Sequence, residues 1–177
     1  MKKLILALSA ALLLVSACGE KTKTITYGDL TFTYPTTYEL DSTTQDDGAL
    51  DVYLQHKDIL SNSLNMNVSK LDADDMEALA NASDEDILDF LSGLCADYYD
   101  IYIGDDDDFE VLTQSDLDTN TSPYMAYVTL TGNAYDEYFD GEVIAMIWDE
   151  YLLVGFISGK DEEASDEVLD FFLSFMM

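Results

Sequence analysis

The sequence predicts an α+β domain in which helices cover a mostly antiparallel sheet. Strand-like segments come in two groups, one near the start of the chain and a run of four after residue 109, and helical segments lie between these groups and at the end. This order is typical of folds in which helices gather on an antiparallel sheet. The chain has 177 residues, of which 48% are hydrophobic, so it is long enough to bury a substantial core.

The first 17 residues have the three zones of a secretory signal peptide. Lys2 and Lys3 come first, the apolar run Leu4–Val15 follows, and Ala17 precedes Cys18. The run is shorter than the roughly 20 residues that a membrane-spanning helix needs. The segment resembles a bacterial lipobox, which implies cleavage before Cys18 and a covalent lipid on its sulfur. The alternative is an ordinary signal peptide cut after Ala17.

Residues 18–24 then form a lipidated cysteine with a short tether, and residues 25–177 form a single acidic α+β domain. Two or three acyl chains suffice for stable anchoring. Six tether residues at about 3.5 Å each keep the domain within some 20 Å of the bilayer. We therefore expect an extracytoplasmic protein anchored by lipid to the cell membrane.

Acidic residues dominate the charge. The chain has 37 of them against seven lysines and no arginine, a formal net charge of −30. Removal of the signal peptide leaves five lysines against the same 37 acids, or −32. Such a body repels nucleic acid and anionic lipid, so we expect no nucleic-acid partner. The acidity indicates either solubility at a crowded surface or attraction of cations, polyamines or basic peptides.

The first half of the chain predicts three strands and two helices. Residues 25–34 form a strand with a tight turn or bulge at Gly28–Asp29, and residues 50–55 and 64–71 form two more. Residues 74–80 form a short helix. Ser83 caps a longer helix over 84–98, with acids in its first turn and Cys95 buried on its apolar face.

The second half predicts four strands and a closing helix. The strands cover residues 109–115, 123–131, 143–148 and 151–158, and the last two are joined in a hairpin at 149–150. Residues 132–141 are expected to be a polar, aromatic loop. Trp148 is expected to close the core, although it could line a groove. The final helix covers about 161–175.

Three stretches of this pattern resemble the PsbP-like family: 27–35 (YGDLTFTYP), 153–157 (LVGFI) and 168–175 (VLDFFLSF). The likeness spans about residues 25–175. It implies an α-β-α sandwich and a binding or accessory role, and it supplies no catalytic motif.

The residue inventory argues against catalysis. His56 is the sole histidine, and we expect it to be a surface residue. No arginine is present to clamp a phosphate or carboxylate, and the motifs G-x-S-x-G, P-loop and H-E-x-x-H do not occur. We therefore predict that the protein is not an enzyme and needs no cofactor beyond the lipid on Cys18.

Two acidic segments are candidate metal sites. Calcium prefers six to eight oxygen ligands, and Asp105, Asp106, Asp107 and Asp108 form the densest run of carboxylates. Consecutive aspartates point in different directions, so a solvated turn is the other interpretation. Residues 116–120 alternate like a calcium loop, but they lack the glycine and the bidentate glutamate of an EF-hand. Calcium binding by Asp105–Asp108 is the alternative function that the sequence suggests.

Three aromatic residues in the 132–141 segment, Tyr135, Tyr138 and Phe139, form the candidate contact surface. Aromatic side chains are enriched at binding interfaces. The other interpretation is that one or two of them fold under and pack on the sheet edge. The sequence as a whole predicts a lipid-anchored, non-catalytic binding or accessory protein of unknown ligand, with a protein or basic peptide at the cell surface as partner.

Overall fold

The structure is a computed structural model that describes residues 21–44, 48–100, 103, 109–121, 123–134 and 137–173. Its elements in chain order are β1 (Thr22–Tyr27), β2 (Leu30–Pro35), β3 (Tyr38–Thr44), β4 (Leu50–His56), β5 (Ser63–Lys70), α1 (Ala73–Asn81), α2 (Asp84–Tyr99), β6 (Phe109–Gln114), β7 (Asp118–Thr121), β8 (Tyr124–Ala134), β9 (Glu137–Trp148), β10 (Tyr151–Gly159) and α3 (Glu162–Leu173).

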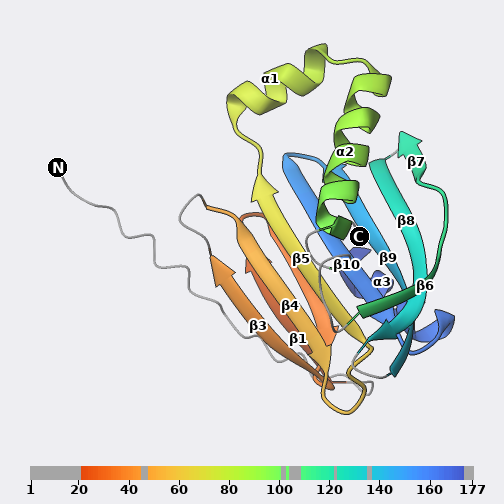
Figure 1. Cartoon of the computed structure of the whole chain (residues 1–177). Coiled ribbons are helices and arrows are strands. Elements are labelled where there is room, and N and C mark those ends of the chain that lie inside the picture. Colours follow the sequence, from red (N-terminus) through yellow and green to blue (C-terminus); the bar gives the residue numbers. More distant parts are fainter. Residues whose placement is uncertain are drawn as a thin grey trace.

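Within the described residues, eight strands form one sheet in the order β3-β4-β5-β10-β9-β8-β6, with β7 also paired to β8. Strands β1 and β2 form a separate two-stranded hairpin. Every pairing is antiparallel. The prediction of an α+β fold with a mostly antiparallel sheet is therefore confirmed, and Figure 1 shows α2 lying along this sheet.

Both faces of the large sheet are covered, and each cover makes its own core. On one face, the β1–β2 hairpin and Val168 of α3 pack against β4, β5, β9 and β10. On the other face, α2 packs against β8, β9 and β10. Strand β9 lies under both covers, which explains its unbroken apolar run from Val143 to Ile147.

The first predicted strand is two strands. Gly28 adopts φ 59° at the turn, a backbone region that favours glycine. A Cβ atom at this position would overlap the hydroxyl oxygen of Tyr151. The backbone N–H of Asp29 donates a hydrogen bond of 3.1 Å to that hydroxyl, so Tyr151 holds the hairpin against the large sheet.

The prediction of a loop over residues 132–141 is wrong. Strand β8 continues to Ala134 and β9 begins at Glu137, with Gly132 paired to Phe139. A Cβ atom on Gly132 would lie 2.9 Å from the Phe139 ring, so glycine leaves room for that ring. The sequence also failed to indicate β3 and β7, which are short and largely polar. The remaining predicted strands and helices are present with shifted ends.

Helices α1 and α2 begin in the same way. Asp72 accepts backbone hydrogen bonds from Asp74 and Asp75, and Asp75 completes a capping box. Ser83 and Asp86 form a second capping box at the start of α2. Side-chain caps satisfy the free N–H groups of the first turn. Among the described helices, none is long and apolar enough to cross a membrane.

Candidate functional site

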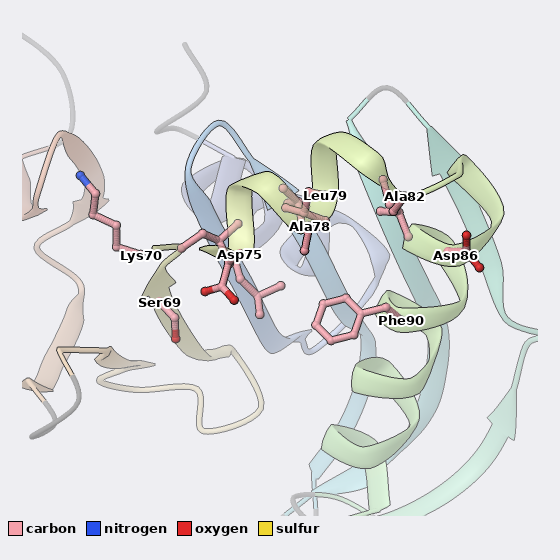
Figure 2. A pocket seen from close by; sticks show the side chains of 12 residues that line it. Ser69, Lys70, Asp75, Ala78, Leu79, Ala82, Asp86 and Phe90 are labelled. Atoms are coloured by element: carbon pink, nitrogen blue, oxygen red, sulfur yellow. The ribbon is translucent and has the colours of Figure 1, made fainter. Parts of the chain in front are cut away.

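A groove of about 430 Å³ lies between α1, α2 and the ends of three strands, β5, β9 and β10. Figure 2 shows it from close by. Its lining is mainly apolar, and the polar groups stand at its margins. The lining residues are Ser69, Lys70, Leu71, Asp75, Ala78, Leu79, Ala82, Asp86, Ile87, Phe90, Ile147 and Leu152.

Helix α1 forms one wall of the groove and contacts the core through Leu79, which is partly buried. None of its residues is fully buried. It follows β5 after Leu71, whose backbone N–H donates to the carbonyl of Glu150 at 2.8 Å. Figure 1 shows α1 beyond the end of β5, whereas α2 runs down along the sheet. Figure 2 shows Ala78 and Leu79 directed from α1 towards the groove.

Helix α2 forms the other wall and contributes Phe90. The buried side of α2 is made by Ile87, Leu91, Cys95 and Tyr98. Phe90 stands beside this stripe and keeps 50% of its surface exposed. Figure 2 shows its ring directed into the groove beneath α1. Phe90 was not predicted from the sequence, although an aromatic residue next to the buried stripe of an amphipathic helix is a signal that could have indicated it.

Two carboxylates stand at the groove, one on each wall. Asp75 belongs to the cap of α1 and Asp86 to the cap of α2. Hydrogen bonds from the Ser83 hydroxyl and then from its backbone N–H lower the pKa of Asp86. Asp86 therefore remains ionised in mildly acidic solution.

One lysine lines the groove, and it is already paired. Lys70 Nζ lies 2.6 Å from a carboxylate oxygen of Glu150 and 5.7 Å from the centre of the Tyr151 ring. The hydrogen bond to Glu150 is the largest of the effects that raise the pKa of Lys70. Figure 2 shows its side chain extending away from the groove. The unpaired charge at the groove is thus negative.

The predicted aromatic surface is divided by the structure. Tyr138 is 46% exposed and donates a hydrogen bond of 3.0 Å to Asp140, and this bond raises the pKa of its hydroxyl. Phe139 is 0% exposed and packs edge-on against Phe156 at 5.7 Å between ring centres. Phe139 is therefore a core residue, because residues on a strand alternate between faces. Tyr135 lies outside the described residues.

Cys18 and Asp105–Asp108 also lie outside the described residues, so lipidation and calcium binding stay predictions. Within residues 116–120, the expected loop is partly strand β7, and Asp118 accepts a hydrogen bond of 3.0 Å from the Tyr127 hydroxyl. Across the described ranges, no group of three or more His, Cys, Asp or Glu side chains is placed to hold a metal ion.

A second pocket is polar and acidic. It measures about 760 Å³ and lies between β6, β8, β9 and α3. Burial raises the pKa of Glu142 there, and the charge of Asp166 adds to the effect. Tyr138 lines this pocket and is absent from the lining of the apolar groove.

The structure shows where three further residues singled out in the sequence lie. His56 ends β4, is half-buried, and packs against the Tyr38 ring at 5.2 Å. Cys95 is buried as predicted, and burial raises the pKa of its thiol to about 11. Trp148 packs against the core on the hairpin side of the sheet, as expected.

Comparison with known proteins adds a likeness in fold. No protein-family model matches the chain, and no curated protein matches it. Among solved structures, the chain is similar to the solution structure of cyanobacterial PsbP (CyanoP) from Synechocystis sp. PCC 6803. The identity is 12%, the TM-score is 0.47, and 92% of each chain is covered. That protein bears the name of the family that the sequence resembles, and the α+β class itself rests on the strand pairing and layers described above.

Proposed function

We propose that this chain is a lipid-anchored extracytoplasmic binding or accessory protein, that it acts without catalysis, and that the groove between α1 and α2 is its binding site. The observation that carries the proposal is Phe90, which keeps half of its surface exposed inside a largely apolar groove. Ligand pockets of about 300–1,000 Å³ with apolar walls and few polar groups are the usual form of a binding site.

The behaviour of α1 supports the same proposal. A helix of nine residues is marginal in water by itself and ordinarily gains its stability from packing an apolar face. Here Ala78, Leu79 and Ala82 line the groove, Leu79 is only partly buried, and no residue of α1 is fully buried. A ligand in the groove would remove these side chains and Phe90 from water. Burial of apolar surface stabilises a complex by about 25 cal/mol per Å².

The proposed location rests on the sequence of residues 1–18. Attachment is testable by metabolic labelling with a clickable fatty acid. We expect the parent chain to take up the label and Cys18→Ser to lose it; equal labelling of both chains would contradict lipidation at Cys18.

The groove is testable with the neutral apolar fluorophore N-phenyl-1-naphthylamine. The full chain would be held in phosphatidylcholine nanodiscs, with protein-free nanodiscs as the blank. We expect saturable fluorescence enhancement, and we expect Phe90→Ala to weaken binding by about tenfold, as a central aromatic contact does. Leu112→Ala is the matched control, because Leu112 is 55% exposed and lies outside the groove. Equal binding by the parent and Phe90→Ala would contradict the proposed site.

A further inference from the structure

We infer that the groove takes a basic amphipathic segment of a partner protein, whose apolar side chains enter beside Phe90 while its lysines or arginines face the carboxylates of α1 and α2. This inference rests on the proposed function of the groove and names the chemistry of its occupant. It follows from the juxtaposition of an exposed aromatic ring, apolar walls and acids on both helices.

The charge of the two helices is of one sign. Residues 73–99 contain eight acidic residues and no lysine. All eight acidic side chains are exposed, namely Asp74, Asp75, Glu77, Asp84, Glu85, Asp86, Asp89 and Asp97. Complementary charges steer a partner to such a surface and fix its orientation there.

Among the described residues, none offers the groove a free cation for an acidic ligand. Lys70 is the one basic residue in the described lining, and it is bound to Glu150. Asp75 and Asp86 would repel the carboxylate of a fatty acid or the phosphate of an anionic lipid. A second copy of this chain would bring the same excess of negative charge to the contact. A basic partner is the occupant that gains from both carboxylates of the groove, Asp75 and Asp86.

The shape of the site suits a helix. Helix α1 has nine residues and is therefore about 13 Å long, or two to three helical turns. An amphipathic helix lays apolar side chains spaced three and four residues apart into a groove between elements. Phe90 on one wall and Leu79 on the other would contact such a row from both sides.

Fluorescence anisotropy with designed peptides tests the inference, again on the full chain in phosphatidylcholine nanodiscs with empty nanodiscs as the blank. The probe is a labelled 14-residue amphipathic helix of leucine and lysine. Two comparison peptides have leucine with glutamate and serine with lysine at the same positions. We expect the leucine–lysine peptide to bind at least about tenfold more tightly than either, because the groove requires both apolar contact and positive charge.

Variants of the chain separate the contribution of apolar contact from that of charge. Phe90→Ala is expected to weaken binding of the leucine–lysine peptide by about tenfold, whereas Leu112→Ala leaves it unchanged. The double change Asp75→Asn and Asp86→Asn retains an oxygen for each cap and is expected to weaken binding several-fold and to flatten its salt dependence. The double change Asp58→Asn and Asp116→Asn alters net charge equally at exposed sites outside the groove, and binding should persist.

Each outcome has a distinct meaning once circular dichroism has shown that the variants are folded. Equal affinity for the leucine–glutamate peptide, or equal loss in both charge variants, overturns the inference. Binding of the neutral fluorophore that depends on Phe90, without binding of the leucine–lysine peptide, also overturns it and leaves the proposed function intact. Failure of both probes overturns the inference and the proposed function together.

Discussion

Helices α1 and α2 follow one another in the chain and begin with the same kind of cap. They differ in how much apolar surface they bury. Each starts with a capping box and carries acids in its first turn. Helix α2 buries Ile87, Leu91, Cys95 and Tyr98 against the sheet. No residue of α1 is fully buried, although Leu79 packs partly against the core, and α1 stands at the side of the groove.

The difference shows that local signals make a helix but do not decide what the helix is for. Caps and acidic first turns act within a few residues, and both helices have them. The contribution of a helix to stability comes instead from the apolar area that it buries. A helix whose apolar residues are only partly covered, as in α1, retains apolar surface for binding.

Truncation of a leucine to alanine should give the largest difference in unfolding free energy between the two helices. Leu91 is 0% exposed on α2, so Leu91→Ala is expected to lower the free energy of unfolding by about 2–5 kcal/mol through lost burial and a cavity. Leu79→Ala on α1 should cost less, about 1 kcal/mol, because Leu79 is only partly buried against the core. Urea denaturation of both variants measures this contrast, and similar losses would mean that α1 belongs to the core.

Removal of the N-terminal caps should give a smaller difference in stability between α2 and α1. Ser83→Ala is expected to lower the global free energy of unfolding by about 1 kcal/mol, because α2 unfolds with the core. Asp72→Ala should leave the global value unchanged and speed amide hydrogen exchange within α1, because a helix with few buried contacts opens locally. A global loss in Asp72→Ala matching that of Ser83→Ala would contradict independent opening of α1.

A carboxylate should affect the stability of the fold where it is partly buried, as Glu142 is on the α3 side of the sheet. We expect this effect to be the smallest of the three. Its pKa is raised by burial first and by Asp166 second, so the folded state binds this proton more tightly than the unfolded chain. The stabilising contribution is complete below the usual glutamate pKa, near 4.5, and is lost as pH rises through the raised pKa.

Glu142→Gln should therefore melt at a higher temperature than the parent at pH 7, with the difference closing towards pH 4. Glu167→Gln, an exposed position on α3, is the control and should show no such trend. Thermal unfolding followed by circular dichroism across this range provides the measurement. A difference in melting temperature that did not change with pH would mean that protonation of Glu142 is not its cause.

Most of the fold could be predicted because its signals are local. The alternation in β5, the double-sided apolar run of β9 and the cap at Ser83 each act over a few residues. Strand β3 was missed because an edge strand with polar residues lacks an apolar pattern. The β8–β9 hairpin was mistaken for a loop because its pairing depends on the partner strand, and Phe139 was therefore counted among the candidate contact residues.

The sequence by itself determined the α+β class, the excess of acid and the burial of Cys95, since composition and periodicity are properties of the chain alone. Only the tertiary structure decided that Phe90 faces α1 across a groove, that Phe139 is in the core, and that Lys70 is paired with Glu150. Lys70 and Glu150 are 80 residues apart, and such contacts depend on how the layers pack. The site is built from these distant contacts, so it emerges only when α1, α2 and the sheet are placed together.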